Sequence, residues 1–213
     1  MSDARRAILE LVATELRGAG RPPLPPPYRG TEIAPDERGG RFTSVLERVG
    51  GRVHRVRSTE EARARLQALL AEAGATRLIV SDASELRALA ADLPGVELLA
   101  PSAPRAELFA ATAGLTTAQW GIAETGTLVL ESAAEQHRLA SLVVPLHVAL
   151  LPVARLLGTL GDALAALQGP TAAPASRTIT FVTGPSRTAD IELELVVGVH
   201  GPKSLHVLLL EAP

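Results

Sequence analysis

Hydrophobic residues recur at two spacings along the chain, and each spacing predicts a different kind of element. Near the start, residues 3–18 are predicted to form an amphipathic helix, because four apolar residues share one helical face: Ile8, Leu11, Val12 and Leu16. Prolines then crowd residues 21–30 (RPPLPPPYRG), and proline cannot continue a helix. The pattern predicts an N-terminal arm of helix and stiff connector over residues 1–30, followed by one domain over residues 31–213.

From residue 40 onward, helical and strand-like segments alternate. Ser58 and Glu61 form a capping box, in which a serine and a glutamate satisfy unpaired N–H groups at the start of a helix. The expected helices begin near residues 42, 58, 82 and 104, and the expected strands cover residues 53–56, 77–80 and 96–99. Helices between short β-branched strands predict a parallel sheet that is covered on both faces.

The second half of the chain is mostly strand-like. Strand patterns cover residues 116–131, 140–150, 178–183 and 191–210, and a helical stripe of leucines covers residues 152–168. The expected fold class is therefore α/β, a single three-layer α/β/α domain with a mixed sheet that is partly antiparallel. Ligands of open α/β sheets bind at the carboxyl ends of strands, so polar residues that follow strands are the candidate site residues.

Composition narrows the classes of function. The chain is 46% hydrophobic with a net charge of −2, which fits a globular domain and gives no electrostatic footprint for nucleic acid. The most apolar region, residues 139–160, is interrupted by Pro145, His147, Pro152 and Arg155, so no membrane span is expected. The first residues lack the apolar core of a signal peptide, which predicts a soluble, cytoplasmic protein.

The sequence lacks the residues that bind several classes of cofactor. The chain has no cysteine, which excludes disulfides and any cysteine-ligated zinc or iron–sulfur site within these 213 residues. The histidines show no i,i+4 spacing of metal ligands, so we expect no metal site. Neither a GxGxxG nor a GxxxxGK[ST] motif occurs, so a dinucleotide-binding fold and a P-loop have no support. We therefore expect no cofactor in this chain.

Three stretches place glycine and polar residues where strands should end. They are GIAETGTLVL (121–130), FVTGPSRTADIE (181–192) and GVHGPKS (198–204). Their candidate site residues are Glu124, Thr125, Gly126, Thr127, Gly184, Ser186, Thr188, Asp190, Glu192, His200 and Gly201. Loops of this kind that converge on one pocket are typical of a binding site, so together the three stretches favour a site.

Each stretch also has a purely structural explanation. Thr-Gly-Thr is a common hairpin turn, and a glutamate beside it is usually solvated. Gly184 permits close backbone approach, and the residues after it fit either a helix whose N–H groups would bind an anion or a strand. Ser186, Asp190 and His200 supply the residue types of a hydrolytic triad, but no GxSxG elbow precedes the serine.

The first stretch, PLHVALLP (145–152) and the block over residues 181–211 closely resemble the lactate-utilisation (LUD) domain family of the LutC/YkgG type. The resemblance covers nearly the whole chain, and its most specific part is GPSRTADIE followed by GVHGP. It implies the three-layer fold related to ribose-5-phosphate isomerase, glucosamine-6-phosphate deaminase and CoA-transferases, the NagB/RpiA/CoA-transferase-like type.

The resemblance also implies a component of a three-protein system that oxidises L-lactate to pyruvate. In that family, a sister LUD-containing subunit carries iron–sulfur clusters. This cysteine-free chain resembles the cluster-free subunit, so we expect clusters only on that partner. A further subunit is expected to complete the system. Carried onto this chain, the family's four loops hold Glu124, Thr125, Gly126 and Thr127; His147; Gly184, Pro185, Ser186, Arg187, Thr188, Asp190 and Glu192; and His200, Gly201 and Pro202.

Three functions remain open, and a homo-oligomer is compatible with each. In the first, Arg187 and backbone N–H groups of residues 184–188 hold the carboxylate of a small hydroxy acid. Glu124 or His200 then accepts the hydroxyl proton while electrons leave for a partner, and Asp190 is the third catalytic candidate. In the second, the chain is a non-catalytic assembly or regulatory subunit that docks through its N-terminal arm. In the third, which rests on fold analogy alone, it is an independent isomerase or CoA-transferase-like enzyme.

Overall fold

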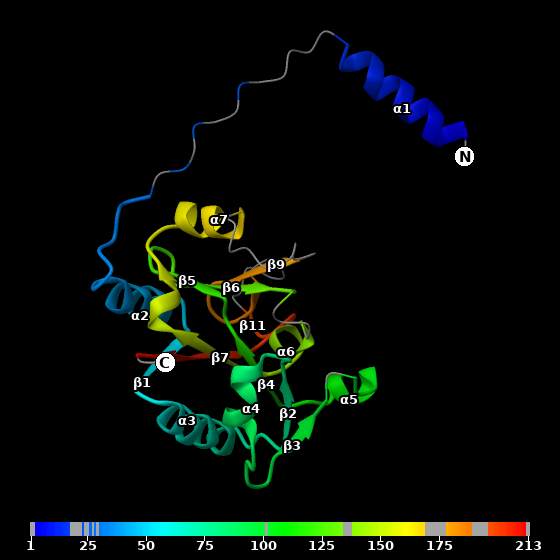
Figure 1. Cartoon of the computed structure of the whole chain (residues 1–213). Coiled ribbons are helices and arrows are strands. Elements are labelled where there is room, and N and C mark those ends of the chain that lie inside the picture. Colours follow the sequence, from blue (N-terminus) through cyan, green and yellow to red (C-terminus); the bar gives the residue numbers. More distant parts are fainter. Residues whose placement is uncertain are drawn as a thin grey trace.

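Six parallel strands form the main sheet of the molecule (Figure 1), in the order β1-β12-β7-β4-β2-β3. Their bounds are β1 Arg52–Val56, β2 Arg77–Val80, β3 Glu97–Leu99, β4 Ala113–Thr117, β7 Leu146–Pro152 and β12 Ser204–Leu210. The computed structural model describes residues 3–17, 23, 26, 28, 30–100, 102–133, 138–168, 178–188 and 196–211. Strand β12, which ends at residue 210, lies between β1 and β7.

Helices α3 (Thr59–Glu72) and α4 (Ser84–Ala90) cover one face of the main sheet. Their apolar side chains pack against every second residue of the strands, and the buried members include Leu66, Leu69, Leu70, Leu86, Leu78, Leu115, Val148 and Leu208. The capping box predicted at the start of α3 is confirmed. Glu61 N–H donates to Ser58 Oγ at 3.2 Å, and Glu61 Oε2 accepts from Arg57 N–H at 2.9 Å.

A second sheet covers much of the other face. It has four strands in the order β8-β5-β6-β9, with the bounds β5 Trp120–Ile122, β6 Thr127–Glu131, β8 Leu156–Leu157 and β9 Ile179–Val182. Helix α2 (Arg38–Arg48) lies beside this sheet and buries its Phe42 and Leu46. These two side chains pack in one cluster with Leu128 of β6 and with residues of β12 in the main sheet, which are Leu205, Val207 and Leu209. The core between the two sheets therefore includes side chains from both of them and from α2.

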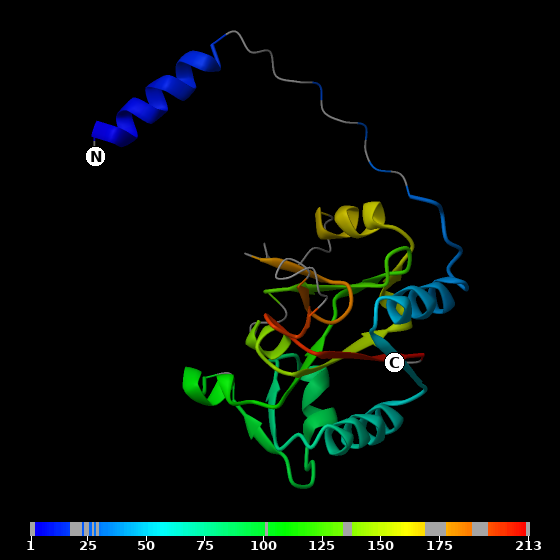
Figure 2. The ribbon, with the colours of Figure 1, turned by 180° about the vertical axis from the view of Figure 1, so that it is seen from behind.

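Three further helices complete the layers (Figure 2). Helices α5 (Arg105–Phe109) and α6 (Leu139–Leu142) pack on the remaining part of this face, over β2 and β3. Helix α7 (Leu160–Gln168) covers the outside of the second sheet, where Ala163 packs with Val129. The α/β class is confirmed. The antiparallel pairs β5–β6 and β6–β9 belong to the second sheet, so the main sheet is wholly parallel instead of mixed.

The single helix predicted over residues 152–168 is wrong in its first half. Strand β7 continues to Pro152, a 3-10 turn η1 covers Val153–Arg155, and β8 follows before α7 begins at Leu160. A second capping box explains this start: Asp162 N–H donates to Thr159 Oγ1 at 3.1 Å, and Thr159 N–H donates to Asp162 Oδ2 at 2.9 Å. The two leucines before Thr159 belong to strand β8. Leucine spacing alone does not distinguish this strand from the helix that follows it.

Two other predicted segments also differ from the structure. The strand pattern over residues 140–150 begins with the short helix α6, and only its later part is β7. After residue 188 the sequence fitted a helix or a strand. The structure has strands β10 (Arg187–Thr188) and β11 (Val196–Val197) in an antiparallel pair, so a strand and not a helix follows Ser186. Residues 191–195 of the predicted strand at 191–210 lie outside the described residues.

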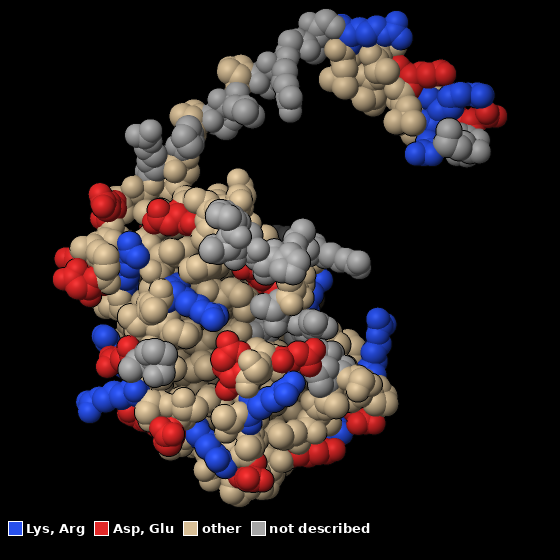
Figure 3. Space-filling view, viewed as in Figure 1, with Lys and Arg blue, Asp and Glu red and all other residues tan. Residues whose placement is uncertain are grey.

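Helix α1 (Asp3–Glu15) confirms the predicted N-terminal helix, and it lies away from both sheets in Figures 1 and 2. None of its residues is buried. Among the helices of the described segments, none combines the length and the apolarity that a bilayer span requires. Figure 3 shows acidic and basic side chains interspersed over the viewed face of the body, in keeping with the small net charge of −2.

Candidate functional site

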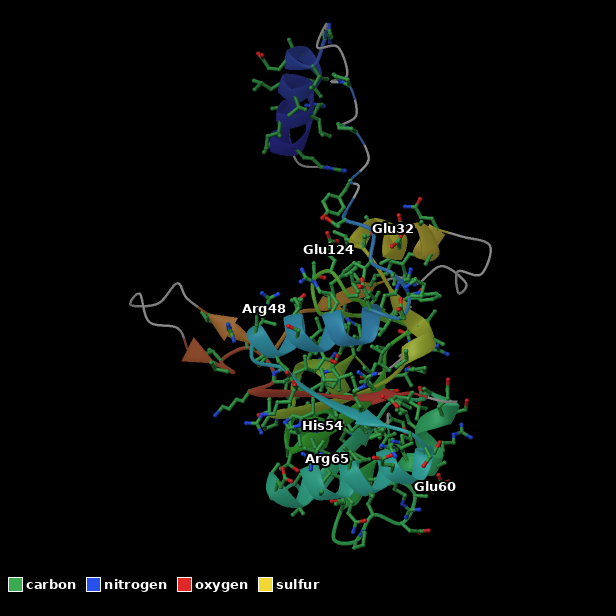
Figure 4. The ribbon with its side chains drawn as sticks, turned by 90° about the vertical axis from the view of Figure 1, so that its left-hand side faces the viewer. Glu32, Arg48, His54, Glu60, Arg65 and Glu124 are labelled. Carbon is green, nitrogen blue, oxygen red and sulfur yellow. The ribbon has the colours of Figure 1, made fainter. Side chains whose placement is uncertain are left out.

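Glu124 lies in the turn between β5 and β6 and is bound on both carboxylate oxygens. Oε2 accepts from the N–H of Leu160, the first residue of α7, at 3.2 Å, and Oε1 accepts from the Tyr28 hydroxyl at 2.6 Å (Figure 4). The carboxylate therefore meets the positive end of the α7 dipole, an arrangement that typically stabilises a helix by about 1 kcal/mol. The hydrogen bond to Glu124 also raises the pKa of Tyr28.

A hollow of about 610 Å³ opens beside Glu124, between the segment before α2 and the first turns of that helix. Its charged lining consists of Glu32, Glu37 and Glu124 against the single guanidinium of Arg41. Three carboxylates facing one cation disfavour an anionic ligand. This hollow is therefore poorly suited to a small carboxylate.

The rest of the Thr-Gly-Thr turn points toward β9. Thr127 Oγ1 lies 2.7 Å from both Thr125 Oγ1 and Thr183 Oγ1, so three hydroxyls form one row at the start of β6. Gly126 adopts a φ of +63°, and a Cβ there would lie 2.8 Å from the Leu46 Cα atom of α2. Glycine is required at this position, because its backbone packs directly against that helix.

The loops at 184–188 and 198–203 are joined through their backbones. Ser186 N–H donates to Pro202 O at 2.9 Å, and Gly198 N–H donates to Ser186 O at 2.8 Å. Lys203 N–H in turn donates to Pro145 O at 2.9 Å, just before β7. Ser186 and the 198–203 loop therefore lie together at the amino ends of β7 and β12.

Arg187 points away from this junction. Its guanidinium donates to Val49 O at the carboxyl end of α2. It also lies close to Gly50, where a Cβ would be 2.6 Å from Arg187 Nη2. Gly184, with a φ of +90°, also approaches Val49, since a Cβ there would lie 2.9 Å from Val49 O. Thr188 follows in β10. The candidate residues Asp190 and Glu192 lie outside the described residues.

His147 is fully buried near the start of β7, two residues after Pro145. Its Nε2 lies 2.9 Å from Thr116 Oγ1 of β4, and its Nδ1 has no hydrogen-bond partner among the described residues. Burial lowers the pKa of His147 to about 4, so the imidazole is neutral at pH 7. It acts in this structure as an interior residue of the sheet, adjacent to the junction described above.

A hollow of about 290 Å³ opens at this junction, at the amino ends of β7 and β12. It is lined by Phe109 from α5, by the segment that leads from α6 into β7, and by the loop with Gly198, Val199, His200, Gly201 and Lys203. His200 and Lys203 are its polar side chains, and both are exposed to solvent. Its volume is near the lower end of the range for small-molecule sites.

The structure brings some of the predicted site residues together and separates others. Ser186, His200 and Gly201 meet beside the strand that carries His147, whereas the carboxylate of Glu124 is directed to α7 and the arm. Sequence reasoning did not assign a role to Lys203, Tyr28, Thr116 or Thr183. Lys203 had a signal, because it directly follows the GVHGP motif and is the only lysine in the chain. No group of three or more His, Asp or Glu side chains suited to a metal occurs among the described residues.

Comparison with known proteins supplies the family. Residues 40–210, which include every strand of both sheets, match the LUD domain. The chain belongs to the LUD domain family. The family resemblance read from the sequence is thus confirmed, while the narrower kinship with NagB/RpiA/CoA-transferase-like proteins stays a prediction.

Curated relatives of this LUD domain chain match it over part of their length. Lactate utilization protein C of Bacillus licheniformis is 36% identical over 105 residues, which are 47% of this chain and 43% of that protein. The protein of the same name from Bacillus subtilis is 35% identical over 102 residues, covering 46% and 42%. An uncharacterized protein of Neisseria meningitidis serogroup B is 39% identical over 103 residues, again covering 46% and 42%. The matched region spans less than half the length of these relatives.

A solved structure shares the fold. The crystal structure of a DUF162 family protein from Deinococcus radiodurans is similar to this LUD domain chain with a TM-score of 0.58 and 23% sequence identity. The similarity covers 84% of this chain and 99% of the other. It supports the arrangement of the sheets and helices described above.

Proposed function

We propose that this LUD domain chain is a component of an L-lactate utilisation system and binds a small hydroxy acid in the hollow beside residues 198–203. The observation that carries the proposal is the hollow itself, which is lined by the loop with the GVHGP motif and by the side chains of His200 and Lys203 from that loop. Relatives with the name Lactate utilization protein C support the substrate class. The roles of the individual residues follow from where their side chains lie.

Lys203 is the cation best placed to hold the carboxylate, because it lines the hollow and is exposed. Arg187, to which the sequence assigned this task, donates to Val49 O instead. His200 lines the same hollow, and we assign to it the acceptance of the hydroxyl proton. The Cα–H bond breaks in the same oxidation, and its two electrons and its proton would pass to an iron–sulfur partner subunit, since these 213 residues contain no cysteine to ligate a cluster. A further subunit would complete the system.

Replacing Lys203 by methionine is expected to weaken binding of L-lactate about tenfold or more, because a hydrogen bond to a charged group contributes about 1.5–3 kcal/mol. Isothermal titration of the full chain with sodium L-lactate measures the change. Methionine keeps the apolar stem of the side chain, so the loss reports the charge.

Arg187→Met is the matched control, since it removes one exposed cation from the neighbouring loop without touching the hollow. This variant is expected to bind L-lactate nearly as tightly as the wild type. If Arg187→Met weakens L-lactate binding more than Lys203→Met does, Arg187 and not Lys203 binds the carboxylate. Absence of binding in the wild type, alone and with the partner subunits added, would remove the hydroxy-acid site.

Helix α1 favours a second candidate function, that of an assembly subunit. The apolar side chains of α1 and of the turn that follows it are all exposed in the structure: Ile8, Leu9, Leu11, Val12 and Leu16. An amphipathic helix with an uncovered apolar face is typical of a segment that docks on another protein. In this function the hollow would bind a hydroxy acid without catalysis, or would be inactive.

Deleting residues 1–27 is the test of the assembly function, because it removes α1 and keeps Tyr28 with its hydrogen bond to Glu124. If α1 docks on the partner, an iron–sulfur subunit co-purifies with the tagged full chain from native cells and is lost with the truncated chain. Glu124→Gln is the control and should retain the partner. Retention of the partner by the truncated chain would speak against docking through α1.

A further inference from the structure

Most residues that line the hollow beside residues 198–203 have apolar side chains. Six residues supply hydrocarbon to it: Phe109, Leu142, Val143, Val144, Pro145 and Val199. Two of them keep large exposed areas at its rim, since Val199 is 48% exposed and Phe109 is 62% exposed. These areas remain in contact with water until a ligand covers them.

The polar side chains of the hollow come from one loop. His200 and Lys203 both belong to the loop that follows β11, which also carries Val199, while α5 and the segment before β7 contribute only apolar side chains. The loop is held in place by three backbone hydrogen bonds, two of them to Ser186 and one to Pro145. The loop therefore presents His200, Lys203 and Val199 on a fixed backbone, in the same hollow as the apolar side chains of α5 and of the segment before β7.

A ligand that fits this division has a carboxylate and hydroxyl at one end and a hydrocarbon chain at the other. Lactate has a single methyl group as its side chain, and it would cover little of the apolar wall. Resting on the proposed function, we propose that the preferred ligand of this hollow is a 2-hydroxy acid with a longer hydrocarbon side chain than that of lactate. The head group binds at Lys203 and His200, and the side chain packs against Val199, Phe109 and the segment before β7.

The expected result is a rise in affinity with chain length. Isothermal titration of the full chain with the sodium salts of L-lactate, L-2-hydroxybutyrate and L-2-hydroxyvalerate should show a Kd that falls up to about fourfold for each added methylene. The head group is the same in all three acids, so the trend isolates the apolar contact.

Two variants connect the trend to this wall. Val199→Ser removes apolar surface from the rim and should flatten the dependence of the Kd on the chain length of the acid. Phe181→Ser is the matched control, because Phe181 is an exposed apolar residue of β9 that does not line the hollow. Both residues are at the surface, so both variants are expected to fold, and circular dichroism melting checks this.

The outcomes separate the two proposals. Affinity that rises with chain length in the wild type and in Phe181→Ser, and is level in Val199→Ser, supports the longer acid. Binding of L-lactate that is as tight as or tighter than that of the longer acids overturns this inference and leaves the proposed function in place. A failure of all three acids to bind overturns both, and a chain-length trend that persists in Val199→Ser overturns the assignment to this wall.

Discussion

Adding a single methyl group at Gly114 is expected to lower the free energy of unfolding by about 3 kcal/mol or more, at the upper end for overpacked cores. A Cβ there would overlap Ala140 O and lie 2.7 Å from the Ala140 carbonyl carbon, so the obstacle is the backbone of α6. Strand β4 lies between β7 and β2 and cannot move aside. Urea unfolding of Gly114→Ala, followed by circular dichroism, measures the loss.

Gly40→Ala is the matched control, because it adds the same methyl group at a site of α2 where nothing lies within 4 Å of the new atom. Alanine is a better helix former than glycine, so this variant should be more stable than the wild type by about 0.5–1 kcal/mol. Equal stabilities of the two variants would show that α6 does not press on β4 as described.

The second large effect is an acid destabilisation that depends on His147. The pKa of this buried imidazole is about 4, against 6.5 for an ordinary histidine, so the unfolded chain binds its proton at a higher pH than the folded chain does. The contribution to stability is complete above pH 6.5 and is lost progressively as the pH falls to 4. The difference of about 2.5 pH units corresponds to about 3 kcal/mol.

His147→Leu should therefore lose about 3 kcal/mol less stability than the wild type between about pH 7 and pH 4. Urea unfolding at a series of pH values measures both slopes, and carboxylates contribute equally to each protein. If the two slopes coincide, the imidazole is accessible to protons in the folded state. The variant also leaves Thr116 without its imidazole partner. This loss lowers the free energy of unfolding equally at all pH values, so it does not change the slope of stability against pH.

A pair of histidines between β1 and β12 adds to the same trend. His54 Nε2 lies 3.0 Å from His206 Nδ1, and Arg65 Nε donates to His54 Nδ1 at 3.2 Å (Figure 4). Burial is the main cause that lowers the pKa of both imidazoles, for His206 to about 4, and the positive charges of Arg52 and Arg65 act in the same direction. The wild type should therefore lose more stability in acid than His147 alone accounts for.

Local patterns in the sequence predicted many of the elements, because they depend on neighbouring residues. The capping box at Ser58 set the start of α3 as the pattern indicates. Thr159 and Asp162 form a box of the same kind. Because apolar residues continue on both sides of this box, the sequence pattern did not predict where β8 ends and α7 begins. Where two elements share an apolar run, hydrophobic periodicity does not locate the boundary between them.

The candidate site was harder to predict, because its geometry depends on distant pairs. The sequence places Glu124 in a turn, but its partners Tyr28 and Leu160 lie 96 and 36 residues away in the chain. The direction of Arg187 is likewise set by Val49, a residue at the end of a helix in the first quarter of the chain. Motifs identified the loops, whereas the folded backbone decides which of their side chains face one hollow.

The position of β12 has a consequence for how the protein is made. Strand β1 is synthesised early, yet its partner in the main sheet is β12, and β12 also joins it to β7. While residues 204–210 are still inside the ribosome, β1 has no neighbouring strand of the main sheet to pair with. The main sheet of a nascent chain therefore cannot close until residues 204–210 have left the ribosome, and β1 stays without its partner strand until then.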